Sequence, residues 1–229
     1  MNEFIYKRKS IRKYDPSELD AATLDQIQAK IKGVTPLYPN IRYSIGIVRK
    51  IIIPMRINAP HYILFGSEDK DGGDENIGFI GQQLSLYFTE LGLGSCWLGR
   101  GKPSEREDSS LPFVICMAFG KPAEPLFRER SEFKRKPLAE IGEGRDNRLE
   151  AARLAPSGLN AQNWYFIAEN GRIHCYLKKP NILAGIVLNR MIRIDMGIAI
   201  CHIAAESERR PNEEAAYISA RLNDDKFAR

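Results

Sequence analysis

Two windows of this sequence repeat in the same order and at nearly the same separation. TPLYPNIRYSIGI at residues 35–47 aligns with APSGLNAQNWYFI at 155–167, and IGFIGQQLSL at 77–86 aligns with MGIAICHIAA at 196–205. Either match alone could arise by chance, because apolar helices and strands align easily. A shared offset of about 120 residues instead indicates a duplicated unit. Two such units would pack inside one chain as the subunits of a homodimer do.

Hydrophobic periodicity places helices and strands in both windows and between them. Helices and strands mix without strict βαβ alternation, so we predict an α+β fold of two related half-units, each with a small, mainly antiparallel sheet packed by helices. The polar, hinge-like stretch at 140–148 divides the chain into half-units at residues 1–140 and 141–229. The predicted helices are 20–32, 77–91 and 192–205, and the predicted strands are 41–48, 61–66, 112–120, a hairpin around Asn170-Gly171 and a last strand in 216–222.

Composition narrows the class of protein. Of the 229 residues, 43% are hydrophobic, which is enough for a sizeable core, and a formal charge of +5 suits an anionic partner without identifying it. No run approaches the ~20 apolar residues of a membrane span, and the N-terminus lacks the apolar core of a secretory signal. We therefore expect a soluble, cytoplasmic protein that contacts no membrane. The four cysteines are Cys96, Cys116, Cys175 and Cys201. They form no CxxC pair and have no metal-type spacing with histidine, so we predict buried reduced thiols and no metal site.

Cationic side chains gather in two short segments. In RKSIR, at 8–12, an extended backbone would send the first, third and fifth side chains to one side, where their donors suit a phosphate dianion. FKRKPL, at 133–138, adds three cations just before a proline. A solvated basic surface has the same composition, so the segments alone leave both interpretations open. No RNA- or DNA-binding motif accompanies the charges, and we expect no nucleic-acid partner.

Two other stretches carry groups that could contact a flat ligand. The glycines of LGLGSCWLGRG, at 91–101, let the backbone approach closely, although a helix C-cap and a loop would use them too. The stretch does not match GxGxxG after a strand, so no Rossmann site is predicted. APSGLNAQNW, at 155–164, places serine and asparagine at a helix-to-strand connection, where they could bond a heterocycle or simply form a turn.

Taken together, these motifs resemble the nitroreductase-like family of FMN-dependent oxidoreductases. Its members begin with R-x-S-x-R/K-x-[YF], here RKSIRKY, and carry A-P-S-x-x-N-x-Q-x-W, here APSGLNAQNW with Asn163 where proline is usual. They also have a helix ending in LGLGSCWLG, then a strand, then RKPL. The resemblance spans Lys7 to about Ala205.

The order of the motifs departs from that family. Its APSxxN loop usually follows the first helix, but here the first-half equivalent, TPLYPN, is degenerate and the intact loop lies in the second half. In the family, FMN lies at a homodimer interface, where one subunit holds the phosphate and the other contributes the loop. The resemblance therefore implies a fused, pseudo-dimeric chain with one FMN between its halves and a second, symmetry-related site that has been lost.

The resemblance also implies a role for each motif. Arg12 would approach the N1–C2 carbonyl edge of the flavin, where a fixed cation stabilises the negative charge that develops on reduction. Flavin supplies the redox chemistry, so no side chain is expected to act as an acid or base. The other implied binding residues are Arg8, Lys9, Ser10, Lys134, Arg135 and Lys136 at the phosphate and ribityl end, Trp97, Leu98 and Gly99 near N5, and Pro156, Ser157 and Asn160 against the ring.

The expected activity is an FMN-dependent reduction that uses NAD(P)H. In a ping-pong cycle, NAD(P)H would reduce FMN and leave before a nitroaromatic or quinone-type acceptor takes its place. Because one half is degenerate, the alternative is a flavin-binding protein without turnover. We expect a monomer that is internally a pseudo-dimer, and a homodimer remains open.

Overall fold

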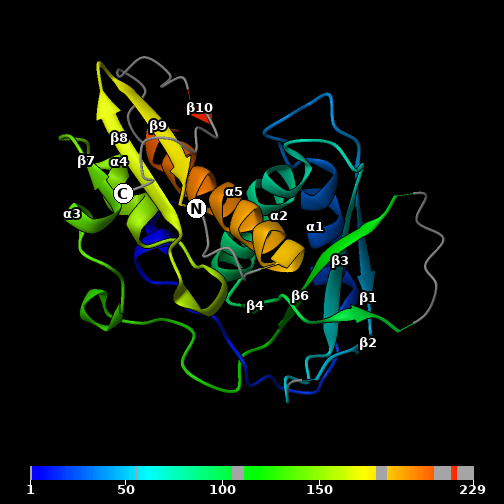
Figure 1. The fold of residues 1–229 in the computed structure, drawn as a ribbon. Coiled ribbons are helices and arrows are strands. Elements are labelled where there is room, and N and C mark those ends of the chain that lie inside the picture. The colour runs from blue at the N-terminus through cyan, green and yellow to red at the C-terminus, as the bar shows by residue number, and fades with distance from the viewer. Residues whose placement is uncertain (1, 55, 105–110, 179–184, 209–217, 221–229) are drawn as a thin grey trace.

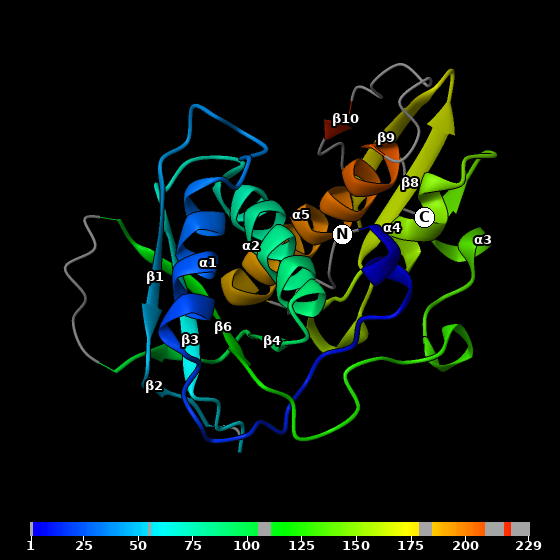
Figure 2. The same cartoon turned by 180° about the vertical axis from the view of Figure 1, so that it is seen from behind.

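Two long helices, α2 (Gly73–Glu90) and α5 (Gly185–Glu208), cross at the centre of the molecule (Figure 1). In this computed structural model the described residues are 2–54, 56–104, 111–178, 185–208 and 218–220. One sheet lies on each side of the helix pair, as the reverse view also shows (Figure 2). The molecule is therefore an α+β fold with a helical centre, as the sequence predicts.

The sheet of the first half is antiparallel throughout, with the strand order β1-β3-β6-β4. Every residue of β3 is buried, because alternate side chains enter different cores: Ile63 and Phe65 join α1 and α2, whereas Tyr62 and Leu64 face the opposite side of the sheet. The helix that covers this sheet with α2 is α1 (Ala21–Lys32), and the strands are β1 (Tyr43–Val48), β3 (His61–Ser67), β6 (Phe113–Gly120) and β4 (Gly94–Leu98).

The sheet of the second half has the order β10-β9-β8-β7. Its centre is the antiparallel hairpin of β8 (Trp164–Glu169) and β9 (Arg172–Leu177), and the short edge strands β7 (Gly142–Glu143) and β10 (Ile218–Ala220) pair in parallel. Asn170 and Gly171 both have positive φ, the conformation of the tight turn that the Asn-Gly pair predicts.

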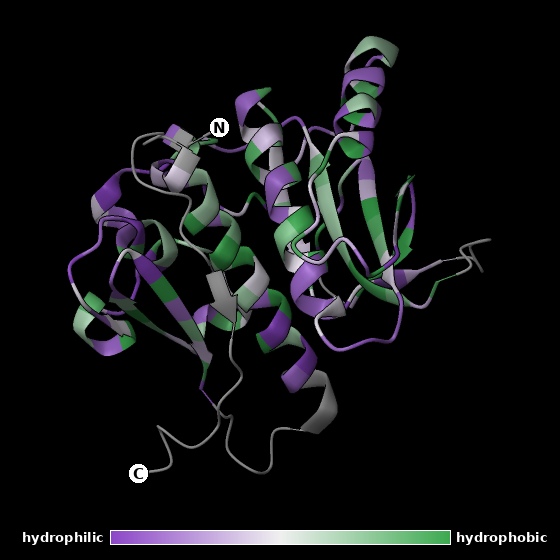
Figure 3. Cartoon of the chain, turned by 90° about the horizontal axis from the view of Figure 1, so that it is seen from above, coloured by the Kyte–Doolittle hydropathy of each residue, from purple (hydrophilic) through white to green (hydrophobic). Residues whose placement is uncertain are grey.

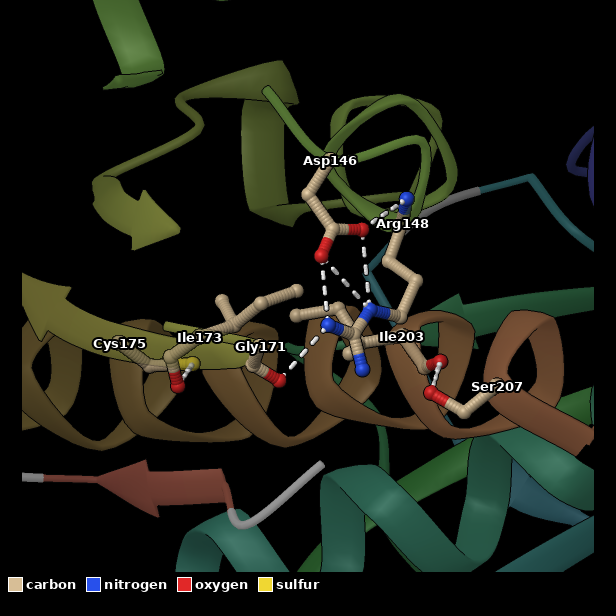
Figure 4. A network of polar contacts seen from close by, with 7 residues as sticks. All are labelled: Asp146, Arg148, Gly171, Ile173, Cys175, Ile203 and Ser207. Carbon is tan, nitrogen blue, oxygen red and sulfur yellow. Dashed lines mark hydrogen bonds and ion pairs between the residues drawn. The ribbon is translucent and has the colours of Figure 1, made fainter. Parts of the chain in front are cut away.

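Arg148 fixes the polar stretch at 140–148 to this second sheet. Its guanidinium pairs with Asp146 and donates to the carbonyl oxygen of Gly171 at 3.0 Å, so the start of α4 (Arg148–Arg153) is tied to the β8–β9 hairpin (Figure 4). The stretch that is predicted to be a hinge is thus joined to the sheet, by the pairing of β7 with β8 and by the hydrogen bond of Arg148.

Short elements complete the chain. In Figure 3 hydrophobic and hydrophilic residues alternate around the helices, whereas the connecting segments are mostly hydrophilic. No helix within the described ranges is long and apolar enough to cross a membrane. The remaining elements are the 3-10 helices η1 (Asn2–Tyr6), η2 (Arg130–Glu132) and η3 (Gly158–Asn160), the helix α3 (Leu138–Ile141), and the antiparallel pair β2 (Ile51–Ile52) and β5 (Lys102–Pro103).

Glycines allow α2 and α5 to touch through their backbones. A Cβ atom on Gly78 would collide with the carbonyl oxygen of Ile194, and one on Gly197 would collide with that of Glu75. Each helix therefore presents a glycine to the other at the crossing point, and any larger side chain there would force the helices apart.

Candidate functional site

The N-terminal segment crosses from the second half to the first. After η1, whose Ile5 packs with Ala151 and Leu154 beside α5, the chain runs along β4 and along the return segment at 122–127. Isolated bridges join Arg8 to Phe127 and Ser10 to Ser95. These contacts bring the RKSIR segment to the junction of the two halves (Figure 1).

Gly94 explains why this segment can approach β4. A Cβ atom on Gly94 would lie 2.6 Å from Cγ1 of Ile11. Its neighbour Ser95 accepts a hydrogen bond of 3.0 Å from the backbone N–H of Ile11 through its own carbonyl oxygen. The glycine is needed for this close packing, and the strand β4 is formed by residues that the sequence suggests are a loop.

Arg8 is buried without enough hydrogen-bond partners. Its side chain is 1% exposed, and Nη2 donates to Oγ of Ser10 at 3.5 Å. Nε and Nη1 have no partner among the residues that the structure describes. A buried cation normally has its donors satisfied, so these two groups indicate a missing acceptor.

Two more arginines lie close to Arg8, and the three together are called the arginine cluster below: Arg8, Arg128 and Arg135. Burial, followed by the charges of Arg128 and Arg135, lowers the pKa of Arg8 to about 9. Burial and the charge of Arg128 likewise lower the pKa of Arg135 to about 10. Nε of Arg128 and of Arg135 has no partner in the described part of the chain. Converging guanidinium groups with free N–H donors make a site for an anion such as phosphate.

Phe133 provides the apolar support of this cluster. The guanidinium carbon of Arg128 lies 4.6 Å from the centre of the Phe133 ring, and that of Arg135 lies 5.8 Å from it. Stacking on an aromatic face stabilises and orients a guanidinium, so the ring holds two members of the cluster while leaving their edges able to donate.

The basic run of the first half is bonded to the APSGLN turn of the second. Nη1 of Arg135 donates to Oδ1 of Asn160 at 2.5 Å, and Nδ2 of Asn160 donates to the carbonyl oxygen of Lys134 at 2.7 Å. The backbone N–H of Lys136 donates to Oε1 of Gln162 at 2.8 Å. Asn160 therefore connects the arginine cluster directly to the turn.

The turn has an unusual backbone. Leu159, Asn160 and Gln162 have φ values of 52°, 58° and 50°, in the left-handed region that residues with a side chain rarely adopt. Leu159 is also 96% exposed. Several such residues in one short turn store conformational strain, which proteins retain most often at ligand-binding sites.

The end of β4 and the turn meet at a single side chain of α5. A Cβ atom on Gly99 would lie 2.7 Å from Cε of Met191, and one on Gly158 would lie 2.9 Å from the same atom. The Trp97–Gly99 stretch and the Pro156–Asn160 turn, which are widely separated in the sequence, thus lie against one methionine. This is the second contact between the two predicted parts of the site.

A buried hydrogen-bond chain holds Trp97. Its Nε1 donates to Oε1 of Gln82 at 3.2 Å, Nε2 of Gln82 lies 2.9 Å from Nε2 of His202, and Nδ1 of His202 lies 2.9 Å from the carbonyl oxygen of Ala151. Because Oε1 of Gln82 accepts from Trp97, Nε2 must donate, and His202 carries its proton on Nδ1. Burial lowers the pKa of His202 to about 3, so the ring is neutral. The hydrogen bonds therefore run in one direction, from Trp97 through Gln82 and His202 to the carbonyl oxygen of Ala151.

The structure brings most of the predicted binding residues to this junction, but in different environments. Lys9 is partly exposed and Lys134 is exposed, whereas Pro156 and Leu98 are buried. The side chain of Leu98 packs in the core behind the sheet, which leaves its backbone as the part that could face a ligand.

Arg12 lies at the edge of the site. Its side chain is exposed, and its backbone N–H donates to Oε1 of Glu124 at 2.7 Å. Burial lowers the pKa of Arg128, the charge of Glu132 opposes this, and the nearby charge of Arg12 lowers the pKa further. Arg12 therefore adds positive charge beside the arginine cluster without being held by a side-chain hydrogen bond of its own among the described residues.

Sequence reasoning missed Arg128 and Asp195. Arg128 begins a recognisable run of charges, but only the fold shows that it stacks on Phe133 beside Arg8. Asp195 is an acidic residue within an apolar helix, a signal that could have found it. The four cysteines are buried and free, as predicted, and no metal-binding group of His, Cys, Asp and Glu occurs in the described ranges.

The α+β fold, with one sheet on each side of a central helix pair, is similar to that of a solved structure described as a nitroreductase. That structure is described as a "putative nitroreductase" from Thermotoga maritima, and it matches with a TM-score of 0.64 and 23% identity over 91% of this chain and 83% of that one. The sequence matches the family described as "Putative TM nitroreductase" over residues 1–207. The chain therefore belongs to this nitroreductase family, which places it among the oxidoreductases.

Smaller nitroreductases resemble part of the chain. A nitroreductase family protein from Clostridium difficile is 20% identical, with a TM-score of 0.49, over 61% of this chain and 95% of that one. A protein described as an FMN-dependent nitroreductase from the same organism is 22% identical, with a TM-score of 0.46, over 58% and 95%. No match was found among curated proteins.

Proposed function

We propose that the protein is an FMN-dependent oxidoreductase that takes hydride from NAD(P)H and reduces nitroaromatic or quinone-type acceptors. The observation that carries the proposal is the arginine cluster around the buried Arg8, whose unpaired N–H groups fit the phosphate of FMN. Two guanidinium groups beside a buried third repel one another, and a bound dianion would offset this repulsion while accepting the free donors. Nitroreductase family membership supports the same conclusion.

The residues around the cluster would divide the binding between them. Arg8, Ser10 and Arg135 would hold the phosphate and the ribityl end, and the backbone between Trp97 and Gly99 would lie along the ring. Ser157 and Asn160 would contact the ring from the turn. When bound, FMN supplies the hydride chemistry, and the chain binds and orients it. Arg12 would place positive charge near the ring edge that becomes negative on reduction.

We also propose that the halves descend from one duplicated unit, because their contacts correspond. In the alignment of Ile77 with Met196, Gly78 falls on Gly197 and Glu75 on Ile194. The collision of a Cβ on Gly78 with the Ile194 carbonyl and that of a Cβ on Gly197 with the Glu75 carbonyl are then the same contact, seen from each helix. Reciprocal contacts of this kind are what a two-fold axis produces.

The turns of the two halves are held in matching ways. Oδ1 of Asn76 accepts from the backbone N–H of Tyr38 at 3.1 Å, and the carboxylate of Asp195 accepts from the backbone N–H of Gly158 at 3.0 Å. Asn76 falls on Asp195 in the helix alignment, and Tyr38 falls on Gly158 in the turn alignment. This second correspondence adds the two turns, which are aligned separately from the helices, and so extends the support that the glycines give to the duplication.

A change in side-chain size supports a single flavin site. In the first half the Tyr38 ring packs on Gly72, where a Cβ atom would lie 2.9 Å from two ring carbons. In the second half Gly158 packs on Met191, and Met191 falls on Gly72 in the alignment. The ring of Tyr38, which belongs to the degenerate turn, thus fills the space over Gly72. We therefore propose one FMN per chain, and a monomer whose two halves pack as the subunits of a dimer do.

Flavin content and reduction test the proposal together. The purified protein should be yellow, or turn yellow with added FMN, and should release one FMN per chain on denaturation. Stopped-flow mixing with NADH or NADPH should bleach the flavin absorbance, and an acceptor should restore it. A colourless protein that ignores added FMN would refute the proposal. Bound flavin that neither NADH nor NADPH reduces would favour the alternative, a flavin-binding protein without turnover.

A further inference from the structure

Asp195 lies under the APSGLN turn and is almost completely buried. Its side chain is on α5, one helical turn after Met191, and is 7% exposed. Both carboxylate oxygens lie 3.0 Å from the backbone nitrogen of Gly158, which is the one donor that reaches them from the described residues. A buried carboxylate normally accepts several hydrogen bonds, so this one is poorly satisfied.

The carboxylate supports the strained part of the turn. A Cβ atom on Gly158 would lie 2.9 Å from Cε of Met191 and 3.6 Å from Oδ2 of Asp195, so both side chains form the floor on which Gly158 rests. The left-handed residues Leu159 and Asn160 follow immediately. Such conformations persist only where surrounding contacts hold them, and the Asp195–Gly158 bond is one of these contacts.

The first half performs the same task without a charge. Oδ1 of Asn76 accepts from the backbone N–H groups of Leu37 and Tyr38 at 2.8 and 3.1 Å. A neutral amide therefore holds the corresponding turn with one more hydrogen bond and with no cost for burying a charge. An asparagine would also accept from Gly158, so the carboxyl group of Asp195 adds something that anchoring alone does not require: the ability to take up a proton.

Burial raises the pKa of Asp195 to about 7, and the hydrogen bond from Gly158 opposes this only in part. The other charged and titratable groups on the elements that pack around Asp195 are bonded to partners of their own or lie farther along α5. Among the described residues they are Asp74 and Glu75 of α2, paired with Arg190 and Arg193; Arg148, Glu150 and Arg153 of α4; His174 of β9, near Glu169; Tyr6 of η1, bonded to Glu206; and the neutral His202.

We propose that Asp195 is a positioning residue whose protonation state tunes how tightly the turn binds the flavin, an inference that rests on the proposed function. A flat ligand against the turn would remove the remaining water from the carboxyl group, which favours its neutral form. Binding would then take up a proton. The affinity for FMN should therefore fall as the pH rises through neutrality, and the effect should vanish when the side chain cannot ionise.

The test compares FMN dissociation constants of wild type and Asp195→Asn across the pH range in which the carboxyl group titrates. Quenching of flavin fluorescence reports binding without turnover. The FMN phosphate itself titrates near pH ~6, but this contribution cancels in the ratio of wild-type to variant dissociation constants. We expect the ratio to be level in mild acid and to rise about fivefold or more between roughly pH 6 and pH 8.5, against a limit of tenfold per pH unit for one proton. A ratio that does not change with pH would overturn the inference.

Asn76→Asp is the matched control, because it places a carboxyl group under the degenerate turn, outside the proposed site. Its FMN affinity should show the pH dependence of wild type. If the ratio of wild-type to Asn76→Asp dissociation constants instead falls with pH by as much as the ratio for Asp195→Asn rises, a general electrostatic effect explains the data and the inference fails.

The failure of the proposed function looks different in this experiment. If no variant binds FMN at any pH, the flavin proposal is wrong and the inference falls with it. If all variants bind FMN and the ratio stays level, only the role of Asp195 is wrong. Circular dichroism and thermal unfolding of each ligand-free variant confirm that the proteins being compared are folded.

Discussion

Arg8→Met should change stability and flavin binding in opposite directions. Arg8 is 1% exposed, has two unpaired donors and lies beside two other arginines. Its pKa of about 9, against an ordinary value of 12.5, corresponds to roughly 5 kcal/mol by which the ligand-free fold disfavours the charged guanidinium. Water penetration and relaxation reduce this figure, and replacing buried charges with apolar side chains of similar size typically gains ~1–4 kcal/mol.

We therefore expect ligand-free Arg8→Met to unfold with a free energy about 2 kcal/mol higher than that of wild type. At the same time the variant loses at least one charge-assisted hydrogen bond to phosphate, worth ~1.5–3 kcal/mol. That loss raises the FMN dissociation constant about 10- to 150-fold. Urea unfolding of the ligand-free proteins and fluorescence titration with FMN measure the two quantities separately.

Arg148→Met is the matched control, because Arg148 is also buried, at 4% exposed, but is paired with Asp146 and with the carbonyl oxygen of Gly171 (Figure 4). Removing one partner of a buried ion pair costs ~3–5 kcal/mol, so this variant should lose stability and keep its FMN affinity. The reasoning is refuted if Arg8→Met is less stable than wild type and binds FMN equally well, since Arg8 would then be an ordinary structural arginine.

Three further predictions concern the helix crossing, the flavin edge and pH. Gly78→Ala and Gly197→Ala should each lower the unfolding free energy by ~2 kcal/mol or more, and by similar amounts, because each new methyl group meets the partner helix backbone; unequal losses in thermal unfolding would count against reciprocal contacts. Arg12→Ala should slow flavin reduction about 10- to 150-fold in stopped-flow absorbance, and a native rate would exclude the role proposed for Arg12. Because the folded-state pKa of Asp195 is raised from 3.8 to about 7, the wild type should lose stability relative to Asp195→Asn as the pH rises from ~4 to ~7, by at most ~4 kcal/mol, and remain level above that. Denaturant midpoints for both proteins at each pH measure this difference, and parallel curves would contradict it.

Long periodic segments were predictable from the sequence, and segments that depend on distant partners were not. The apolar runs of β3 and β6 and the spacing of α1 gave their positions to within about two residues. β4 was not recognised, because glycine usually signals a loop, and Gly94 is there to accommodate Ile11. α2 begins at Gly73, earlier than predicted, since Gly72 with a φ of 88° ends the loop immediately before it.

The site also has features that the sequence predicts and features that only the fold shows. The motifs identified Arg8, Ser10, Arg135 and Asn160, and the structure places them at one junction. The sequence could not show that Arg8 is buried with unpaired donors, because burial depends on η1 and on the return segment packing around it. The division of the chain at residue 140 and the partners of the protein stay predictions.

The proposed fusion of two units would explain why the halves could become unequal. In a homodimer, one change in the turn sequence alters both sites, so a bulky residue that closes one site also closes the other. In a fused chain each turn has its own codons, and Tyr38 can fill the first turn while Gly158 leaves room in the second. The paired exchange keeps the packing balanced, since the large residue stands on the turn in one half (Tyr38 on Gly72) and on the helix in the other (Met191 under Gly158). Close-packed interiors tolerate changes that conserve volume best, so Tyr38→Gly alone should leave a cavity above Gly72 and destabilise the fold. It should not restore a second flavin site, because Arg193, which lies near Tyr38, is already paired with Glu75.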